Sequence, residues 1–197
     1  MYKETIKAVI SGIWPSLLIL ISILFTIRFF SYISSKKEFI FYKEILYLIF
    51  IVYLMCFFYV LTFADVDWST ANIIPFKEIF RFEIGSRSFI KNVFGNIILF
   101  LPYGFYLSYF TKIRKARYAL GFSIFISFAV EIIQYRIGRV FDIDDIILNV
   151  IGGILGYYIY QIMDFLLNKT FLKNRKELIC NSLIIILIVA FVLYLGG

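Results

Sequence analysis

The chain has 197 residues, of which 62% are hydrophobic and 21% aromatic, and its mean hydropathy is +0.90. This composition leaves too little polar surface to coat a water-soluble domain, so it excludes a soluble globular protein and predicts an integral membrane protein. The chain contains no histidine, which excludes His-based catalysis and the usual zinc sites. Its net charge is +7. Given where the lysines and arginines lie, this charge indicates the orientation in the membrane and no nucleic-acid partner.

Six apolar segments are long enough to cross a hydrocarbon core of roughly 30 Å as helices. In chain order they cover residues 10–30, 45–63, 93–110, 118–134, 146–167 and 178–195. The sequence therefore predicts an all-α, polytopic membrane helical bundle with a short outer interfacial helix. We divide it into two N-terminal transmembrane helices (residues 1–62), a core of an outer loop and three transmembrane helices (63–167), and a C-terminal transmembrane helix (168–197).

Lysines and arginines predict the orientation, because loops that stay in the cytoplasm keep an excess of positive charge. The loops after the first, third and fifth segments are rich in these residues, whereas the loops after the second and fourth are balanced or acidic. We therefore expect the latter two loops, and both termini, to lie outside the cytoplasm. Lys3 and Lys7 weakly oppose this assignment.

The longest stretch between the predicted segments covers residues 64–92, which is long for an idle connection. Within it, Asn72 is followed by Pro75 and Phe76, and Pro75 suits the first position of a short helix with Phe76 and Phe80 on one face. We expect an amphipathic helix lying at the outer interface. A simple interfacial anchor and a functional contact surface are both compatible with this pattern.

Polar residues of the membrane segments gather at one depth. Counted from the predicted outer boundaries at about 1.5 Å per residue, Asn96, Glu131 and Asn149 lie roughly 6–8 Å below the outer surface. Asn92 shares a helix face with Asn96, and Gln134 shares one with Glu131. A carboxyl group is kept in hydrocarbon only where it faces the bundle interior or a water-filled cavity. The sequence thus predicts a polar pocket that opens outward; interhelical hydrogen bonding without a pocket is the alternative.

A polar stripe begins the fifth segment. At 100° per residue its members fall within one narrow arc, with Arg139 beside it. The members are Asp142, Asp145, Asn149, Gly152 and Gly156. Asp144 lies off the stripe, so we interpret it as a solvated neighbour. Gly152 and Gly156 form a small-xxx-small pattern, which is typical of close packing between membrane helices.

Four motifs in order carry a family resemblance. They are Asn72-x-x-Pro75-Phe76; Asn92-x-x-Gly95-Asn96 with Phe100-x-Pro102-x-Gly104; Glu131-x-x-Gln134; and Arg139-x-x-Asp142-x-x-Asp145-x-x-x-Asn149-x-x-Gly152-x-x-x-Gly156. Together they resemble the VanZ-like family over roughly residues 63–160. The resemblance implies a multi-pass protein of the bacterial cytoplasmic membrane and an association with low-level resistance to the glycopeptide teicoplanin. It implies no defined reaction.

Three functions fit the sequence together with this resemblance. In the first, the polar pocket engages a cell-envelope component, either a lipid-linked intermediate or a lipoglycopeptide, whose tails lie among the helices. The expected ligand-binding residues are Asn92, Asn96, Glu131, Gln134, Arg139, Asp142, Asp145 and Asn149, next to the separate outer-loop motif of Asn72, Pro75 and Phe76.

In the second function, the chain is an intramembrane hydrolase or transferase acting on a lipid-linked substrate. Asp142, Asp145 and Glu131 are then the candidate ligands of a divalent cation such as Mg²⁺, and Arg136 or Arg139 holds a phosphate. Acids at a helix start are also favourable without any ligand, no nucleophile–base pair is identifiable, and no other cofactor is expected. In the third function, the aromatic outer loop around Trp68 contacts another membrane protein.

Overall fold

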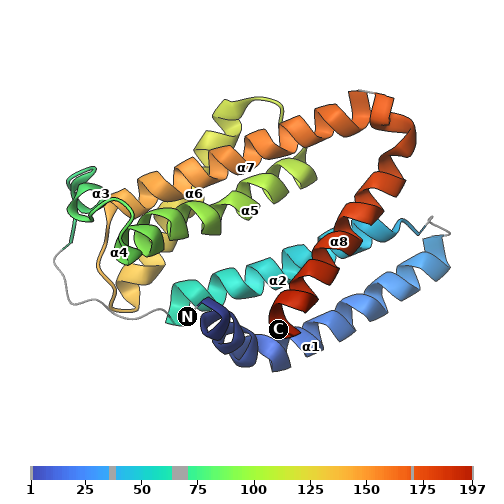
Figure 1. Cartoon of the computed structure of the whole chain (residues 1–197), viewed down its shortest axis with the longest axis horizontal. Helices are drawn as coiled ribbons and strands as arrows, with labels where there is room; N and C mark the ends of the chain where they lie inside the picture. The colour runs from blue at the N-terminus through green and yellow to red at the C-terminus, as the bar shows by residue number, and fades with distance from the viewer. Residues whose placement is uncertain (1, 36–38, 64–70, 170, 197) are drawn as a thin grey trace. The chain divides into compact units, whose positions relative to one another are not determined.

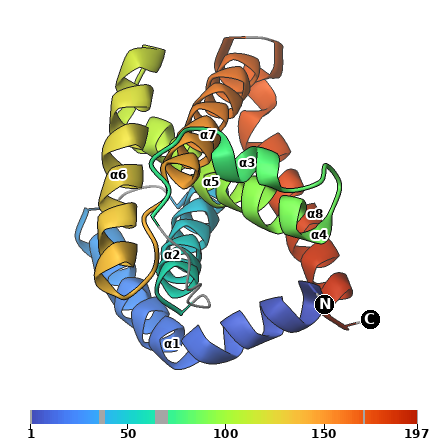
Figure 2. The ribbon, with the colours of Figure 1, turned by 90° about the vertical axis from the view of Figure 1, so that its left-hand side faces the viewer.

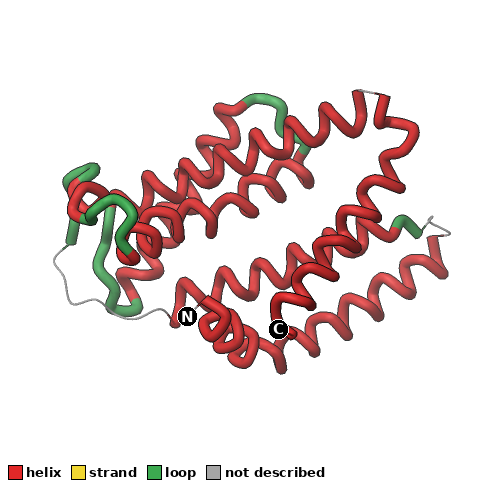
Figure 3. The backbone as a smooth tube through the Cα atoms, in the orientation of Figure 1, coloured by secondary structure: helices red, strands yellow, loops and turns green. Residues whose placement is uncertain are grey.

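The computed structural model describes residues 2–35, 39–63, 71–169 and 171–196. Over these residues the chain consists of helices joined by short loops, with no strand (Figure 3). The helices are α1 (Tyr2–Ser35), α2 (Phe41–Phe63), α3 (Lys77–Arg81), α4 (Arg87–Phe89), α5 (Gly95–Thr111), α6 (Ala116–Arg136), α7 (Ile143–Lys169) and α8 (Lys176–Gly196). A π-helical turn (Ile90–Phe94) leads into α5 and a 3₁₀ turn (Phe171–Arg175) leads into α8.

Among the described residues, five stretches of helix are long and apolar enough to cross a membrane. They are Ser11–Ser34, Phe41–Thr62, Arg87–Thr111, Ala116–Arg136 and Ile143–Asn168. These stretches are helical because a chain in hydrocarbon has to satisfy its backbone hydrogen bonds internally. The predicted all-α membrane bundle is confirmed, and α8 covers the sixth predicted segment.

The chain forms two compact units. One consists of residues 1–60 and 170–197, and the other of residues 61–169. In the first unit, α1 and α2 run antiparallel: a Cβ atom on Gly12, near the start of α1, would lie 2.6 Å from the ring of Tyr59, near the end of α2. The second unit contains the motifs singled out in the sequence.

In the second unit, α7 packs mainly along α5 and also along α6 (Figures 1 and 2). The helices α5 and α6 make few contacts with each other. The buried apolar residues of this unit come from all three helices and from the turn before α5: Val93, Phe100, Tyr106, Ala119, Val130, Leu148, Tyr157, Tyr160 and Leu167. The helix α7 is therefore the central element of the unit.

Glycines allow α5 and α7 to approach closely. A methyl group on Gly152 would overlap the carbonyl oxygen of Ile97, and one on Gly156 would overlap that of Leu101. From the other side, a methyl group on Gly104 of α5 would overlap the backbone of α7. Larger side chains at these positions would force the two helix backbones apart.

Candidate functional site

Asn72 joins the loop that follows α2 to the loop that precedes α7. Asn72 and Asp142 form an isolated parallel bridge, in which the Asn72 N–H donates to the carbonyl of Phe141 (2.9 Å) and the Ile143 N–H donates to the carbonyl of Asn72 (3.0 Å). The Asn72 side-chain amide donates to Asp142 Oδ1 at 2.8 Å. Two motifs that are 70 positions apart in sequence thus lie side by side.

Asp144 is the acceptor that holds α3. Its carboxylate accepts hydrogen bonds from the backbone N–H of Phe76, of Glu78 (2.7 Å) and of Ile79 (3.2 Å). These are free amides at and just before a helix start, which need an acceptor and which attract negative charge. With only 2% of its surface exposed, Asp144 is a buried cap supplied from another helix. Our interpretation of Asp144 as a solvated neighbour was wrong.

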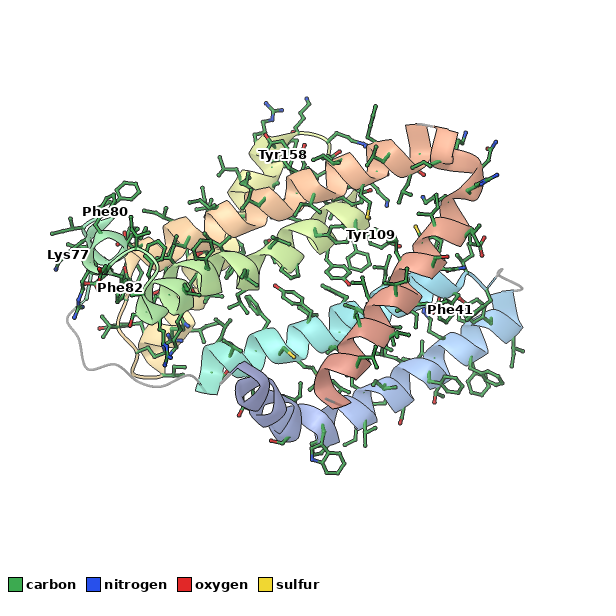
Figure 4. The ribbon with its side chains drawn as sticks, viewed as in Figure 1. Phe41, Lys77, Phe80, Phe82, Tyr109 and Tyr158 are labelled. Carbon is green, nitrogen blue, oxygen red and sulfur yellow. The ribbon has the colours of Figure 1, made fainter. Side chains whose placement is uncertain are left out.

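The short helix that follows Asn72 begins later than the sequence predicted. Pro75 does not occupy its first position, because α3 begins only at Lys77 and Phe76 adopts a left-handed backbone conformation with φ of 68°. That conformation accompanies the hydrogen bond from the Phe76 N–H to Asp144. Figure 4 shows Phe80 pointing away from the helix, where it is 82% exposed. Trp68 lies outside the described residues.

Glu131 is buried at the end of α6, with 1% of its surface exposed. Its Oε2 accepts the backbone N–H of Asp142 at 3.1 Å. The orientation of the Gln134 amide that satisfies its neighbours donates to Glu131 Oε1 at 3.0 Å and accepts from the Arg139 guanidinium. Arg139 also attracts the carboxylates of Glu131 and Asp145 electrostatically. The turn between α6 and α7 is therefore held by a connected polar network.

Asn96 extends this network to α5, because its side-chain amide donates to Asp145 Oδ1 at the start of α7. Asn92 is exposed, whereas Asn96 is half-buried. The π-helical turn before α5 (Ile90–Phe94) contains Asn92, and the common face of Asn92 and Asn96 stays a prediction.

Asn149 lies one turn further along α7 and is 3% exposed. Its side-chain amide donates to Ser127 Oγ of α6 at 3.1 Å, and its Oδ1 is buried without a partner among the described residues. Ser123, one turn before Ser127, is also fully buried. Sequence reasoning missed both serines, although their i,i+4 spacing on one face of α6 was a usable signal.

The site thus has two levels of exposure. Its buried members are Asn72, Glu131, Gln134, Asp144 and Asn149, and its half-buried members are Asn96, Arg139, Asp142 and Asp145. Burial raises the pKa of the Asp142 carboxyl above its usual range, against the lowering effect of its hydrogen bonds from Asn72 and from the Asp144 N–H. We call these nine residues the polar network.

The sequence suggested Glu131, Asp142 and Asp145 as candidate metal ligands. Among the described residues, no group of three or more His, Cys, Asp or Glu side chains is arranged to hold a metal ion. Glu131, Asp142 and Asp145 instead direct their hydrogen bonds to backbone and amide groups.

Comparison with known proteins identifies the family. A family model described as VanZ/LLP1 matches residues 41–164, which include the whole polar network. The chain belongs to the VanZ/LLP1 family. This confirms the resemblance that the four motifs carried, and it makes the polar network part of the VanZ/LLP1 region of the chain, whereas α1 and α8 lie outside that region.

The VanZ/LLP1 chain is also similar to Protein VanZ of Enterococcus faecium. The two are 26% identical over 151 residues, which cover 74% of this chain and 88% of that protein. No solved structure matches the chain. With five apolar helices of spanning length and its family membership, the chain is a multi-pass membrane protein.

Proposed function

We propose that this VanZ/LLP1 protein resides in a bacterial cytoplasmic membrane and engages a cell-envelope component through its polar network, at the extracytoplasmic face, and that this engagement lowers susceptibility to teicoplanin. The observation that supports the proposal is the layered build of the network. Half-buried Asp142 and Arg139 are held in place by buried Glu131 and Gln134, and Asp145 accepts a hydrogen bond from half-buried Asn96, as a preorganised binding site requires.

The chemistry of the half-buried members defines the class of ligand. A guanidinium, two carboxyl groups and the Asn96 amide offer both donors and acceptors within a small area, which matches a head group that carries amide, amino or hydroxyl groups. Exposed apolar side chains such as Ile98 on α5 and Ile132 on α6 line the same helices. A lipid-linked envelope intermediate or a lipoglycopeptide combines such a head with acyl tails.

The orientation of the second unit supports an extracytoplasmic site. The network joins the loops that follow α2 and α6, which are poor in excess positive charge. The loop between α5 and α6 lies at the opposite end of these helices and carries Lys112, Arg114 and Lys115. By the positive-inside rule that basic loop faces the cytoplasm, and the polar network then faces outward.

The test is the teicoplanin susceptibility of a sensitive bacterial host that expresses the full chain. Glu131→Gln and Asp145→Asn should abolish the protection, whereas Asp164→Asn, an equivalent change at the other end of α7, should retain it. Membrane abundance of each variant is measured in parallel by immunoblotting. Protection that survives both network substitutions at normal abundance would overturn the proposal.

A contact role for the outer loop predicts a different pattern. If the exposed Phe76 and Phe80 dock on another membrane protein, Phe76→Ala with Phe80→Ala should remove the protection and a copurifying partner, while Glu131→Gln should leave both unchanged. That outcome would replace ligand engagement by an assembly function for the same family member.

A further inference from the structure

A polar cavity lies in the unit that does not contain the polar network, at the junction of α1 and α2. It has a volume of about 160 Å³ and is lined by Arg28, Ser31, Tyr32, Ile40, Lys43, Glu44 and Tyr47. All seven lining residues are half-buried. Apart from Glu44, their polar groups are able to donate hydrogen bonds, and the cavity is separate from the polar network because it lies in the unit of residues 1–60 and 170–197.

An ion pair fixes one wall of this cavity. Arg28 Nε lies 3.1 Å from Glu44 Oε2, the Tyr32 hydroxyl donates to Glu44 Oε1 at 2.6 Å, and the Arg28 guanidinium lies over the ring of Tyr47, 4.3 Å from its centroid. The charge of Glu44 is therefore matched by Arg28. These contacts also hold the two helices together next to the cavity.

Lys43 leaves the cavity with a net positive charge. Among the described residues, its ammonium group faces the ring of Tyr42 at 6.0 Å from the centroid and forms no ion pair. Ser31 adds a hydroxyl donor on the facing helix. An ammonium, a hydroxyl and the remaining N–H groups of Arg28 form a donor set that suits a phosphate group.

The depth of the cavity matches that of a lipid phosphate. At this junction the candidate span Ser11–Ser34 ends and the candidate span Phe41–Thr62 begins. The lining residues begin there and reach inward to Arg28 and Tyr47, about 9 Å along each helix. We propose that this cavity binds the phosphate of an anionic membrane phospholipid.

The proposal is tested with the purified full chain in detergent, titrated with phosphatidylglycerol or phosphatidylcholine and followed by native mass spectrometry. Lys43→Gln should weaken phosphatidylglycerol binding about fivefold, the effect of one basic residue near a membrane surface. Lys43→Arg should retain the binding. Lys115→Gln, which removes an exposed lysine from the loop between α5 and α6, is the matched control and should change nothing.

Two further arms make the result decisive. Ser31→Ala keeps every charge and should weaken phosphatidylglycerol binding about threefold, the worth of a single hydrogen bond, so the proposal stays testable even if Lys43→Gln fails to fold. Inorganic phosphate, added at constant ionic strength, should not displace the lipid. Displacement would assign the cavity to a free phosphate, and equal binding by Lys43→Gln, Ser31→Ala and Lys115→Gln would overturn the proposal. Because the polar network is untouched in these variants, teicoplanin protection is scored separately.

Discussion

The two ends of α7 hold their acidic residues in different ways. At the first turn, Asp144 is 2% exposed and accepts hydrogen bonds from three backbone amides of the loop before α3 and of α3 itself. Near the last turns, Asp164 Oδ2 lies 2.8 Å from Arg114 Nη1, and the Arg114 side chain is 57% exposed. Buried amides fix one position for their acceptor, whereas an ion pair in water exchanges easily.

Each end of α7 also holds a loop from elsewhere in the unit. At the Asp164 end, Gln161 donates to the carbonyl of Ile113 (2.6 Å) and Tyr157 donates to that of Arg114 (2.8 Å). These bonds position a connection from residue 112 to 115 between adjacent helices. At the Asp144 end, the bonds position a segment that is 65 to 68 residues distant. The first end therefore positions the loop before α3 and the start of α3, and the second end positions the loop between α5 and α6, which is 43 to 50 residues distant.

Among substitutions at the two ends of α7, Asp144→Ala should have the largest effect on the free energy of unfolding. It leaves three amides without their acceptor, at about 1–3 kcal/mol for each buried group, so we expect a loss of at least about 3 kcal/mol in the free energy of unfolding in detergent. Hydrogen exchange at residues 76–79 should accelerate. Asp144→Asn, which keeps one carbonyl oxygen, is the control and should lose less; unchanged exchange in Asp144→Ala would contradict the capping role.

Glu131→Ala should have the next largest effect. It removes the acceptor of the Asp142 N–H and of the Gln134 amide, and we expect about 2 kcal/mol of destabilisation. Glu131→Gln retains an oxygen toward the Asp142 N–H and should cost less than half as much. Equal losses in these two variants, measured by denaturant unfolding in the same detergent, would mean that the negative charge itself stabilises the fold.

Asp164→Asn tests the other end of α7 and should cost less than about 1 kcal/mol, because Arg114 is largely exposed and its attraction is screened. Raising the salt concentration should bring the melting temperature of the wild type toward that of the variant. A loss as large as that of Asp144→Ala would erase the distinction between the two ends.

The smallest expected effect concerns the pH dependence of Asp142. Burial raises the pKa of its carboxyl, so the folded state holds the proton more tightly than the unfolded state. The resulting stabilisation is fully present below the unfolded pKa of about 3.9 and is lost as the pH rises through the higher folded pKa. Asp142→Asn should remove this contribution. Melting temperatures of the two proteins should therefore converge at acid pH and separate, with the variant the more stable, toward neutral pH.

The sequence predicted the helices well because spanning length and hydropathy are local properties of each segment. It also predicted that Asn96, Glu131 and Asn149 would gather near one end of the helices, since depth follows from a constant rise per residue. In the structure, Asn96 contacts Asp145, Glu131 contacts the Asp142 backbone, and Asn149 contacts Ser127. Depth alone does not specify these partners.

Asp144 shows where such reasoning fails. Its partners are backbone amides, which every residue except proline possesses, so no residue type signals the contact. Long-range backbone contacts of this kind depend on tertiary packing.

The bridge between Asn72 and Asp142 also has a consequence for the order of assembly. It closes a loop of about 70 residues, and the entropic cost of such a closure is met only when other contacts already restrict the chain. The packing of α7 against α5 and α6 provides that restriction. We expect the polar network to form last during biogenesis, so a chain released before Asp142 has emerged would insert its first helices and still lack that network.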